Sequence, residues 1–137
     1  MKIFLLFIML FLHIVDDYYL QGILANLKQK LWWEEHAPDP LYKNDYIIAL
    51  LTHAFSWTFM ILLPYMVIMI LTNNIGITDI TGYLVLFTVN MIIHSWVDNL
   101  KANERIINLL ADQIIHVLQI ISTWAVISFD WGWGING

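Results

Sequence analysis

The chain has 137 residues, of which 60% are apolar and only 12% are charged, and it contains no cysteine. Soluble domains average roughly 45–50% apolar and about 25% charged residues. The net charge is −5 with only six lysine and arginine residues, which excludes a nucleic-acid-binding domain, and the composition also excludes disorder and a disulfide scaffold. We therefore predict one integral membrane domain over residues 1–137.

Four apolar segments are predicted to cross the membrane as helices, at about residues 3–27, 46–71, 80–100 and 106–129. Each reaches the ~20 residues that a spanning helix needs. The predicted fold class is therefore all-α, an integral membrane four-helix bundle with short loops and a second helix kinked at Pro64. Lys2 before the apolar run Ile3–Leu12 also suits a cleaved signal peptide, but no small-residue cleavage site follows this run.

The basic residues predict an orientation. Five of the six lie in the first and third loops, at Lys28, Lys30, Lys43, Lys101 and Arg105. Because loops rich in lysine and arginine stay in the cytoplasm, both termini are expected outside the cytoplasm.

Ionisable residues inside the spans repeat one spacing. They form three pairs four residues apart, His13 with Asp17, His94 with Asp98, and Asp112 with His116, and His53 stands alone on the second helix. Residues four apart share one helix face, and a charge inside a span costs about 2.5–3.5 kcal/mol on insertion scales. The predicted spans place these residues at similar depths, so we expect them to meet in one layer.

This combination of side chains predicts a metal site. Imidazole nitrogens and carboxylate oxygens bind Zn²⁺, Mn²⁺ and Fe²⁺. The predicted cofactor is one or two divalent transition-metal ions, with zinc favoured and manganese or iron as alternatives. The predicted ligands are His13, Asp17, His53, His94, Asp98, Asp112 and His116. Asp98 or Asp17 is the predicted catalytic general base, where it is not itself a ligand.

Neighbouring polar residues are expected to support these ligands, namely Gln21, Asn90, Lys101 and Gln113. Lys101 would pair with Asp98 or with an anionic substrate, or simply extend toward the membrane surface. Asp16 is left out, because it points about 100° away from Asp17 on an α-helix. A histidine in a span can also serve as a hydrogen-bonding group between helices or as part of a proton relay.

The order of these motifs resembles a known family. H-x-x-x-D-x-x-x-Q at 13–21, a lone His53, H-x-x-x-D-x-x-K at 94–101 and D-Q-x-x-H at 112–116 resemble small bacterial and phage membrane proteins of unknown function. The wider group of membrane-bound metal-dependent hydrolases is similar. The resemblance implies the same seven metal ligands and a location in the bacterial inner membrane, that of the host if the chain is phage-encoded. Tyr18 stands where the family often has phenylalanine.

Three functions follow as expectations. The first is a metal-dependent hydrolase that acts on a lipid or lipid-linked phosphate near the cytoplasmic leaflet, with membrane lipid as its partner and a homo-oligomer as an option. The second is a small transporter or proton conductor that uses histidine and aspartate. The third is a non-enzymatic phage membrane factor with a structural metal. The sequence has no glycine-rich phosphate loop and no H-E-x-x-H motif.

Overall fold

The computed structural model describes residues 2–72 and 75–129, and these residues form helices and connections without a strand. The elements in chain order are α1 (Lys2–Ile14), a π-helix η1 (Val15–Leu20), α2 (Leu24–Leu27), α3 (Lys30–His36), a 3-10 turn η2 (Pro40–Tyr42), α4 (Asp45–Leu71), α5 (Ile77–Ala102) and α6 (Leu109–Phe129). The described residues therefore have the predicted all-α fold.

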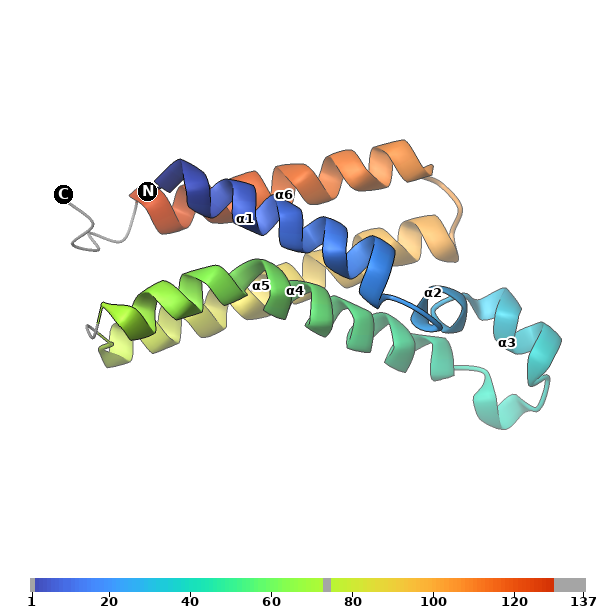
Figure 1. The fold of residues 1–137 in the computed structure, drawn as a ribbon. Helices are drawn as coiled ribbons and strands as arrows, with labels where there is room; N and C mark the ends of the chain where they lie inside the picture. Colours follow the sequence, from blue (N-terminus) through green and yellow to red (C-terminus); the bar gives the residue numbers. More distant parts are fainter. Residues whose placement is uncertain (1, 73–74, 130–137) are drawn as a thin grey trace.

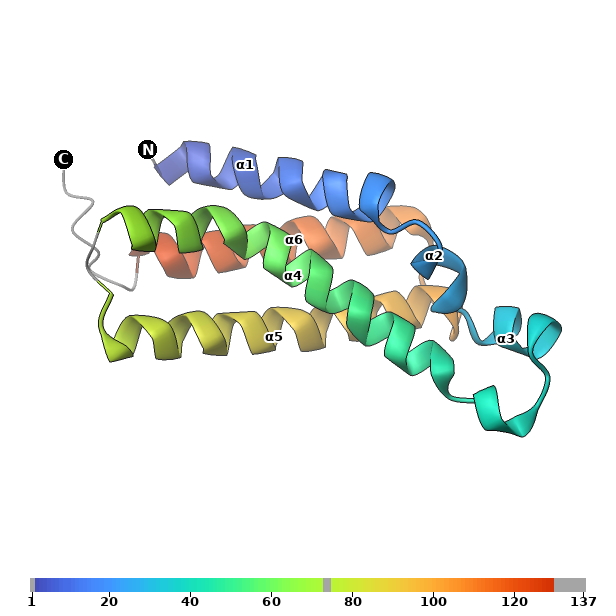
Figure 2. The same ribbon diagram turned by 60° about the horizontal axis from the view of Figure 1, so that its bottom comes forward.

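The four long helices pack as a bundle (Figures 1 and 2). Helix α4 packs against α1 and α5, and α6 packs against the same two helices from the other side. The start of α1 and the end of α6 lie at one end of the bundle, together with the turn from α4 to α5 (Figure 2). The opposite end carries α2, α3 and the connection from α5 to α6, and is called the α3 end below.

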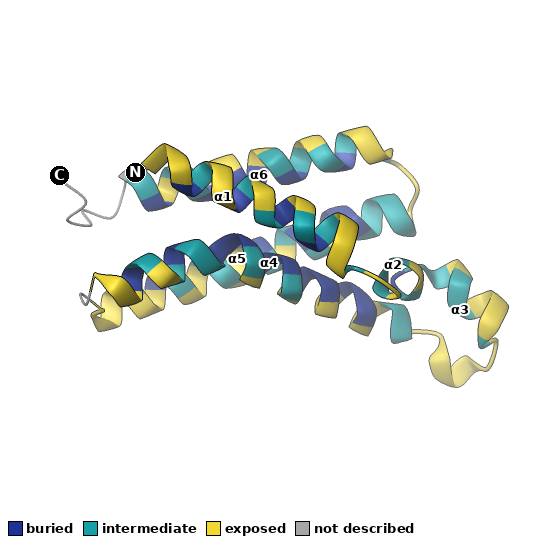
Figure 3. Cartoon of the chain, viewed as in Figure 1, coloured by how far each residue is buried: buried dark blue, intermediate teal, exposed yellow. Residues whose placement is uncertain are grey.

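Four helical stretches are long and apolar enough to cross a membrane, at Lys2–Leu20, Pro40–Leu71, Ile77–Ala102 and Leu109–Ser128. Large apolar side chains cover their outer faces, where Figure 3 shows mostly exposed and intermediate residues. Phe4, Phe7 and Phe11 on α1 are each more than 60% exposed. Apolar surface on this scale is typical of a face that contacts lipid or a partner.

Several helix ends differ from the sequence prediction. The first span ends at Leu20, not at residue 27, because Gly22 adopts a left-handed φ of +50° and turns the chain into the separate helix α2. Helix α6 begins at Leu109, not at residue 106, because the Asn108 side chain accepts a hydrogen bond from the backbone N–H of Ala111. Helix α4 continues through Pro64 and arches along its length (Figure 1).

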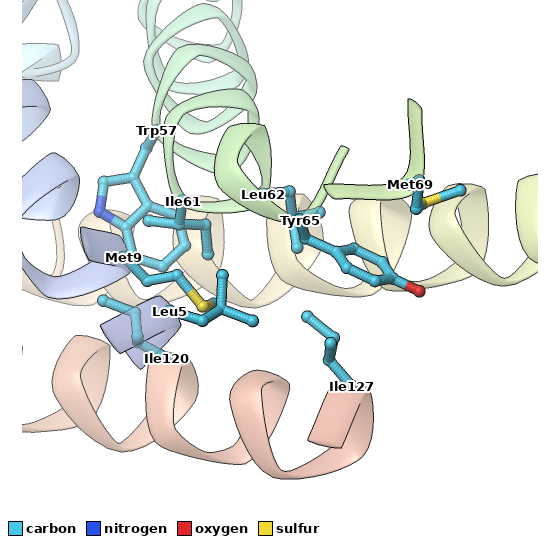
Figure 4. Packing of buried hydrophobic residues seen from close by; sticks show 9 residues of the cluster. All are labelled: Leu5, Met9, Trp57, Ile61, Leu62, Tyr65, Met69, Ile120 and Ile127. Carbon is cyan, nitrogen blue, oxygen red and sulfur yellow. The ribbon is translucent and has the colours of Figure 1, made fainter. Parts of the chain in front are cut away.

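The interior is divided along the bundle axis. Apolar side chains from α1, α4 and α6 fill the half near the chain ends, as Figure 4 shows for Leu5, Met9, Trp57, Ile61, Leu62, Tyr65, Met69, Ile120 and Ile127. Buried histidine and aspartate side chains lie toward the α3 end, and a smaller buried polar group of Asn90, Gln119 and Thr123 lies on their other side. Trp57 lies at the border, because its indole N–H donates to His13 Nδ1 at 2.8 Å and its ring stacks on His94.

Candidate metal centre

A layer of histidines and aspartates lies between the apolar half and the α3 end. All four long helical stretches contribute to it: His13, Asp16 and Asp17 come from α1 and η1, His53 from α4, His94 and Asp98 from α5, and Asp112 and His116 from α6. No side chain among the eight is more than 8% exposed. We call these eight residues the His/Asp cluster.

His53 stands at the centre of the cluster. Its Nε2 atom lies 3.2 Å from His94 Nε2, 3.4 Å from Asp17 Oδ1 and 3.4 Å from Asp98 Oδ2. The other oxygen of Asp98 lies 3.4 Å from His116 Nε2. The potential ligand atoms therefore form one connected set that joins all four helical stretches.

These separations match those of metal ligands. Two ligands held at about 2.1 Å in a tetrahedral zinc site are about 3.4 Å apart, whereas most N–H···O hydrogen bonds span 2.7–3.2 Å. Two groups have ligand atoms within 4.8 Å of one another: Asp17 with His53 and His94, and His94 with Asp98 and His116. His94 belongs to both groups, so the two candidate sites adjoin.

Asp16 has the position of an outer carboxylate behind a metal-binding histidine. One oxygen of Asp16 lies 3.5 Å from His53 Nδ1, on the side of the ring away from the cluster centre, and the other accepts a hydrogen bond from the Ser56 hydroxyl at 2.6 Å. A carboxylate that faces the second ring nitrogen fixes the tautomer and orientation of a metal-binding histidine. Asp16 is thus suited to orient His53 Nε2 toward Asp17 and Asp98.

The charges of the cluster do not balance within the protein. Lys28 Nζ lies 2.5 Å from Asp98, and Lys101 Nζ lies 2.6 Å from Asp112. Within the described part of the chain, Asp16 and Asp17 have no lysine or arginine within ion-pair distance. Four carboxylates and two lysines leave a formal charge of −2 when the histidines are neutral, which one divalent cation offsets.

All seven predicted ligands lie in the cluster, but two of them stand at its edges. His13 accepts the Trp57 hydrogen bond, and its Nδ1 lies 3.6 Å from Asp17. Asp112 pairs with Lys101 and contacts His116 Nε2 at 3.4 Å. Neither residue belongs to the two groups of closest ligand atoms, which consist of Asp17, His53, His94, Asp98 and His116.

Gln21 and Gln113, two of the four predicted supporting residues, contact the cluster through their side-chain amides. The Gln21 amide nitrogen lies 2.9 Å from His53 Nε2. The Gln113 side chain donates to Asp17 Oδ2 at 3.1 Å and to Asp112 Oδ2 at 3.2 Å. Gln113 thereby fixes the carboxylate oxygen of Asp17 that faces away from His53.

Of the other two, Lys101 also contacts the cluster and Asn90 does not. Lys101 pairs with Asp112 instead of Asp98, because Lys28 from the segment after α2 already occupies Asp98. Asn90 lies outside the cluster, where its Oδ1 accepts hydrogen bonds from Gln119 and Thr123 on α6. Asn90 therefore joins α5 to α6 and does not orient a histidine.

Sequence reasoning missed Asp16 and the partner of Lys28. Asp16 lies in the π-helix, where the Gln21 N–H donates to the Asp16 carbonyl five residues earlier. The wider turn changes the angle between neighbouring side chains, so Asp16 and Asp17 both face the cluster. Two adjacent aspartates in an apolar span were the available signal, since each needs a partner. Nothing in the sequence pairs Lys28 with Asp98, which lies 70 residues away.

Comparison of the chain with known protein families, with curated proteins and with solved structures finds no match.

Proposed function

We propose that this chain is an integral membrane protein that binds a divalent transition-metal ion in the His/Asp cluster and uses it to hydrolyse a lipid or lipid-linked phosphate. The observation that supports this proposal is the set of buried ligand atoms of His94, Asp17 and Asp98, each 3.2–3.4 Å from His53 Nε2, in a cluster whose carboxylates and lysines leave a charge of −2. The positive-inside rule supports an inner-membrane orientation with the α3 end in the cytoplasm.

The donor set favours zinc, because nitrogen and oxygen ligands with tetrahedral spacing suit Zn²⁺, while Mn²⁺ and Fe²⁺ accept the same donors. The two groups share His94, so one ion could draw its ligands from both. One ion also offsets the charge of −2, whereas two ions would leave a net charge of +2.

A divalent ion lowers the pKa of a water molecule to about 7 and polarises a phosphoryl group. The protein would supply the remaining chemistry through its carboxylates. Asp17 is one candidate proton acceptor where it is not itself a ligand, because its side chain is the most exposed of the cluster at 8%. Asp98 is the other candidate base, and Lys28 would hold its carboxylate ionised.

Metal analysis tests the proposal most directly. Protein purified in detergent should retain about one equivalent of metal, and His94→Ala should remove most of it, because His94 belongs to both groups of ligand atoms. Thermal stability should fall together with metal content, since the carboxylates lose their counter-charge. Wild-type protein should also release phosphate from lipid or lipid-linked phosphate substrates in a metal-dependent manner.

His36→Ala is the matched control, because His36 is exposed and stacks on Trp32 far from the cluster. This variant should keep its metal. Metal-free wild-type protein with undiminished stability would contradict the metal site. If the protein retains metal but hydrolyses no substrate, the metal has a structural role and the hydrolase proposal is wrong.

A connected row of titratable groups also favours proton conduction as a second candidate. The row runs from Asp112 through His116, Asp98 and His53 to Asp16, with neighbouring atoms 3.4–3.5 Å apart. The charge of −2 would then be balanced by two protons on the histidines. Proton flux into liposomes under a pH gradient, in the presence of a chelator, would support this candidate over the hydrolase.

A further inference from the structure

A pocket of about 370 Å³ opens at the α3 end between α2 and the connection from α5 to α6. Its lining includes Lys28, Lys101 and Arg105, together with the amides of Gln21 and Gln29. Three cationic side chains and two amides make this pocket rich in hydrogen-bond donors, and it contains no acidic lining residue among the described ones. Such a lining favours an anionic ligand.

The pocket lies next to the His/Asp cluster, and three of its lining side chains stand between the two. Lys28 contacts Asp98, Lys101 contacts Asp112, and Gln21 contacts His53. Three lining side chains therefore touch three members of the cluster directly. A ligand bound in the pocket lies one side chain away from the proposed metal ligands.

Lys101 and Arg105 can donate to such a ligand. The ammonium of Lys101 has three donors, it makes one hydrogen bond to Asp112, and 28% of the side chain is exposed. The Arg105 guanidinium pairs with no carboxylate in the part of the chain that the structure describes. Arg105 thus lines the pocket as an exposed cation without a counter-ion among the described residues.

The backbone at Arg105 supports a role for its side chain. Its φ is +56°, and it is the one described non-glycine residue with a positive φ. Glycine adopts this left-handed conformation without the steric penalty that a Cβ atom brings. The backbone conformation at this position therefore disfavours arginine, so the presence of arginine here points to a role for its side chain.

We infer that this pocket binds the phosphate group of the substrate, with Arg105 and Lys101 as its main donors beside the His/Asp cluster. The inference rests on the proposed metal-dependent hydrolysis and names its substrate class, a phosphate ester. The phosphate can belong to a lipid headgroup or to a soluble ester. The pocket accommodates a headgroup at the bundle end, and an acyl chain would stay in the surrounding membrane.

Metal and phosphate binding should be coupled. Without a cation, the cluster together with Lys28 and Lys101 carries a formal charge of −2 and repels an anion. With one divalent ion, the cluster is neutral and the charge of Arg105 remains. Phosphate should therefore bind more tightly to metal-loaded protein than to chelated protein.

Binding of inorganic phosphate to the full chain in detergent, measured by calorimetry on metal-loaded protein, tests this inference. Arg105→Gly should weaken phosphate binding about tenfold, the effect of one lost charge-assisted hydrogen bond. The same variant should keep its metal and its thermal stability, because glycine relaxes the backbone at this position. A merely structural role for Arg105 would instead lower stability.

Lys43→Gln is the charge-matched control, because Lys43 lies in the first loop and lines a different pocket. It should leave phosphate binding unchanged. Competition by phosphatidic acid in phosphatidylcholine vesicles, but not by glycerol phosphate, would support a lipid headgroup, and competition by both would support a soluble ester as well.

If Arg105→Gly and Lys101→Gln retain metal and bind phosphate as tightly as the wild type, phosphate does not bind in this pocket. The proposed metal site would not be affected by this result. Phosphate binding that depends on Arg105 in a protein that holds no metal would support the pocket and contradict the proposed hydrolysis.

Discussion

The Lys28–Asp98 pair illustrates how a buried charge depends on its partner. Both side chains are at most 5% exposed, and their charged atoms are 2.5 Å apart. Removing two charges from water costs several kcal/mol per ion, and their attraction offsets this cost only while both are present. Loss of one partner leaves the other charge buried and unpaired, which is worse than loss of both.

Asp98→Asn should therefore destabilise the protein by about 3–5 kcal/mol, because the Lys28 ammonium is left without its carboxylate. Lys28→Gln added to Asp98→Asn should recover at least about 1 kcal/mol, since it removes the stranded charge. Chemical unfolding in detergent with a chelator present measures both changes without a contribution from metal.

Lys30→Gln is the control for this pair, because Lys30 contacts Glu104 at 3.8 Å with both side chains more than 40% exposed. It should change stability by less than about 1 kcal/mol. Additive effects of Asp98→Asn and Lys28→Gln would show that the two residues are not coupled.

For single residues, the sequence predicts the histidine and aspartate pairs, because their spacing of four residues is a local property of a helix. It does not predict which lysine meets which aspartate. Lys101 is three residues from Asp98 in sequence but pairs with Asp112 on α6, and Lys28 reaches Asp98 from another element. Such pairings depend on how the helices pack against one another, and the local spacing of residues gives no information about this packing.

The π-helix η1 is the element that decides the composition of the cluster. It turns both Asp16 and Asp17 inward, so Asp16 can lie behind His53 while Asp17 faces its Nε2 atom. An α-helix over the same residues would place the two carboxylates about 100° apart. The wider turn of the π-helix reduces this angle, which helps Asp16 to lie behind His53.

Deletion of Tyr19 should convert this segment to an α-helix, because a π-bulge is one residue longer than the α-helical turn it replaces. Tyr19 is 77% exposed, so no buried contact is removed. We expect metal affinity to fall about 10–100-fold, the effect of losing an outer-shell partner. Competition with a chelator of known affinity measures the change.

Deletion of the exposed Pro38, between α3 and η2, shortens the chain by one residue away from the cluster. It should leave metal affinity unchanged. Wild-type metal affinity in the Tyr19 deletion would mean that η1 does not position the ligands.

Long apolar runs predict the existence of the four long helices, but local capping decides their ends. Helix α5 begins at Ile77, three residues before the predicted span, because the Asp79 side chain accepts the N–H of Gly76. The π-helix has no comparable sequence signal, since its residues are as apolar as those of an α-helix apart from the two aspartates.

The whole molecule separates an apolar half from a polar half. The apolar core lies near the start of α1 and the end of α6, and the His/Asp cluster lies toward the α3 end, beneath the cationic pocket. The segments that carry Lys28, Lys30, Lys43 and Arg105 are at the same end as the pocket (Figure 2). The orientation of the protein therefore decides which compartment supplies the ligand of the pocket.

Single-cysteine labelling tests this orientation, because the chain has no cysteine of its own. Pro38→Cys lies in the first loop at the α3 end, and Ile75→Cys lies in the connection from α4 to α5 at the opposite end, with both positions exposed. If the positive-inside rule holds, a membrane-impermeant thiol reagent added to intact spheroplasts should label Ile75→Cys strongly and Pro38→Cys only after lysis. The reverse pattern would place the pocket on the outer face, where it would meet phosphate esters from outside the cell and not from the cytoplasm.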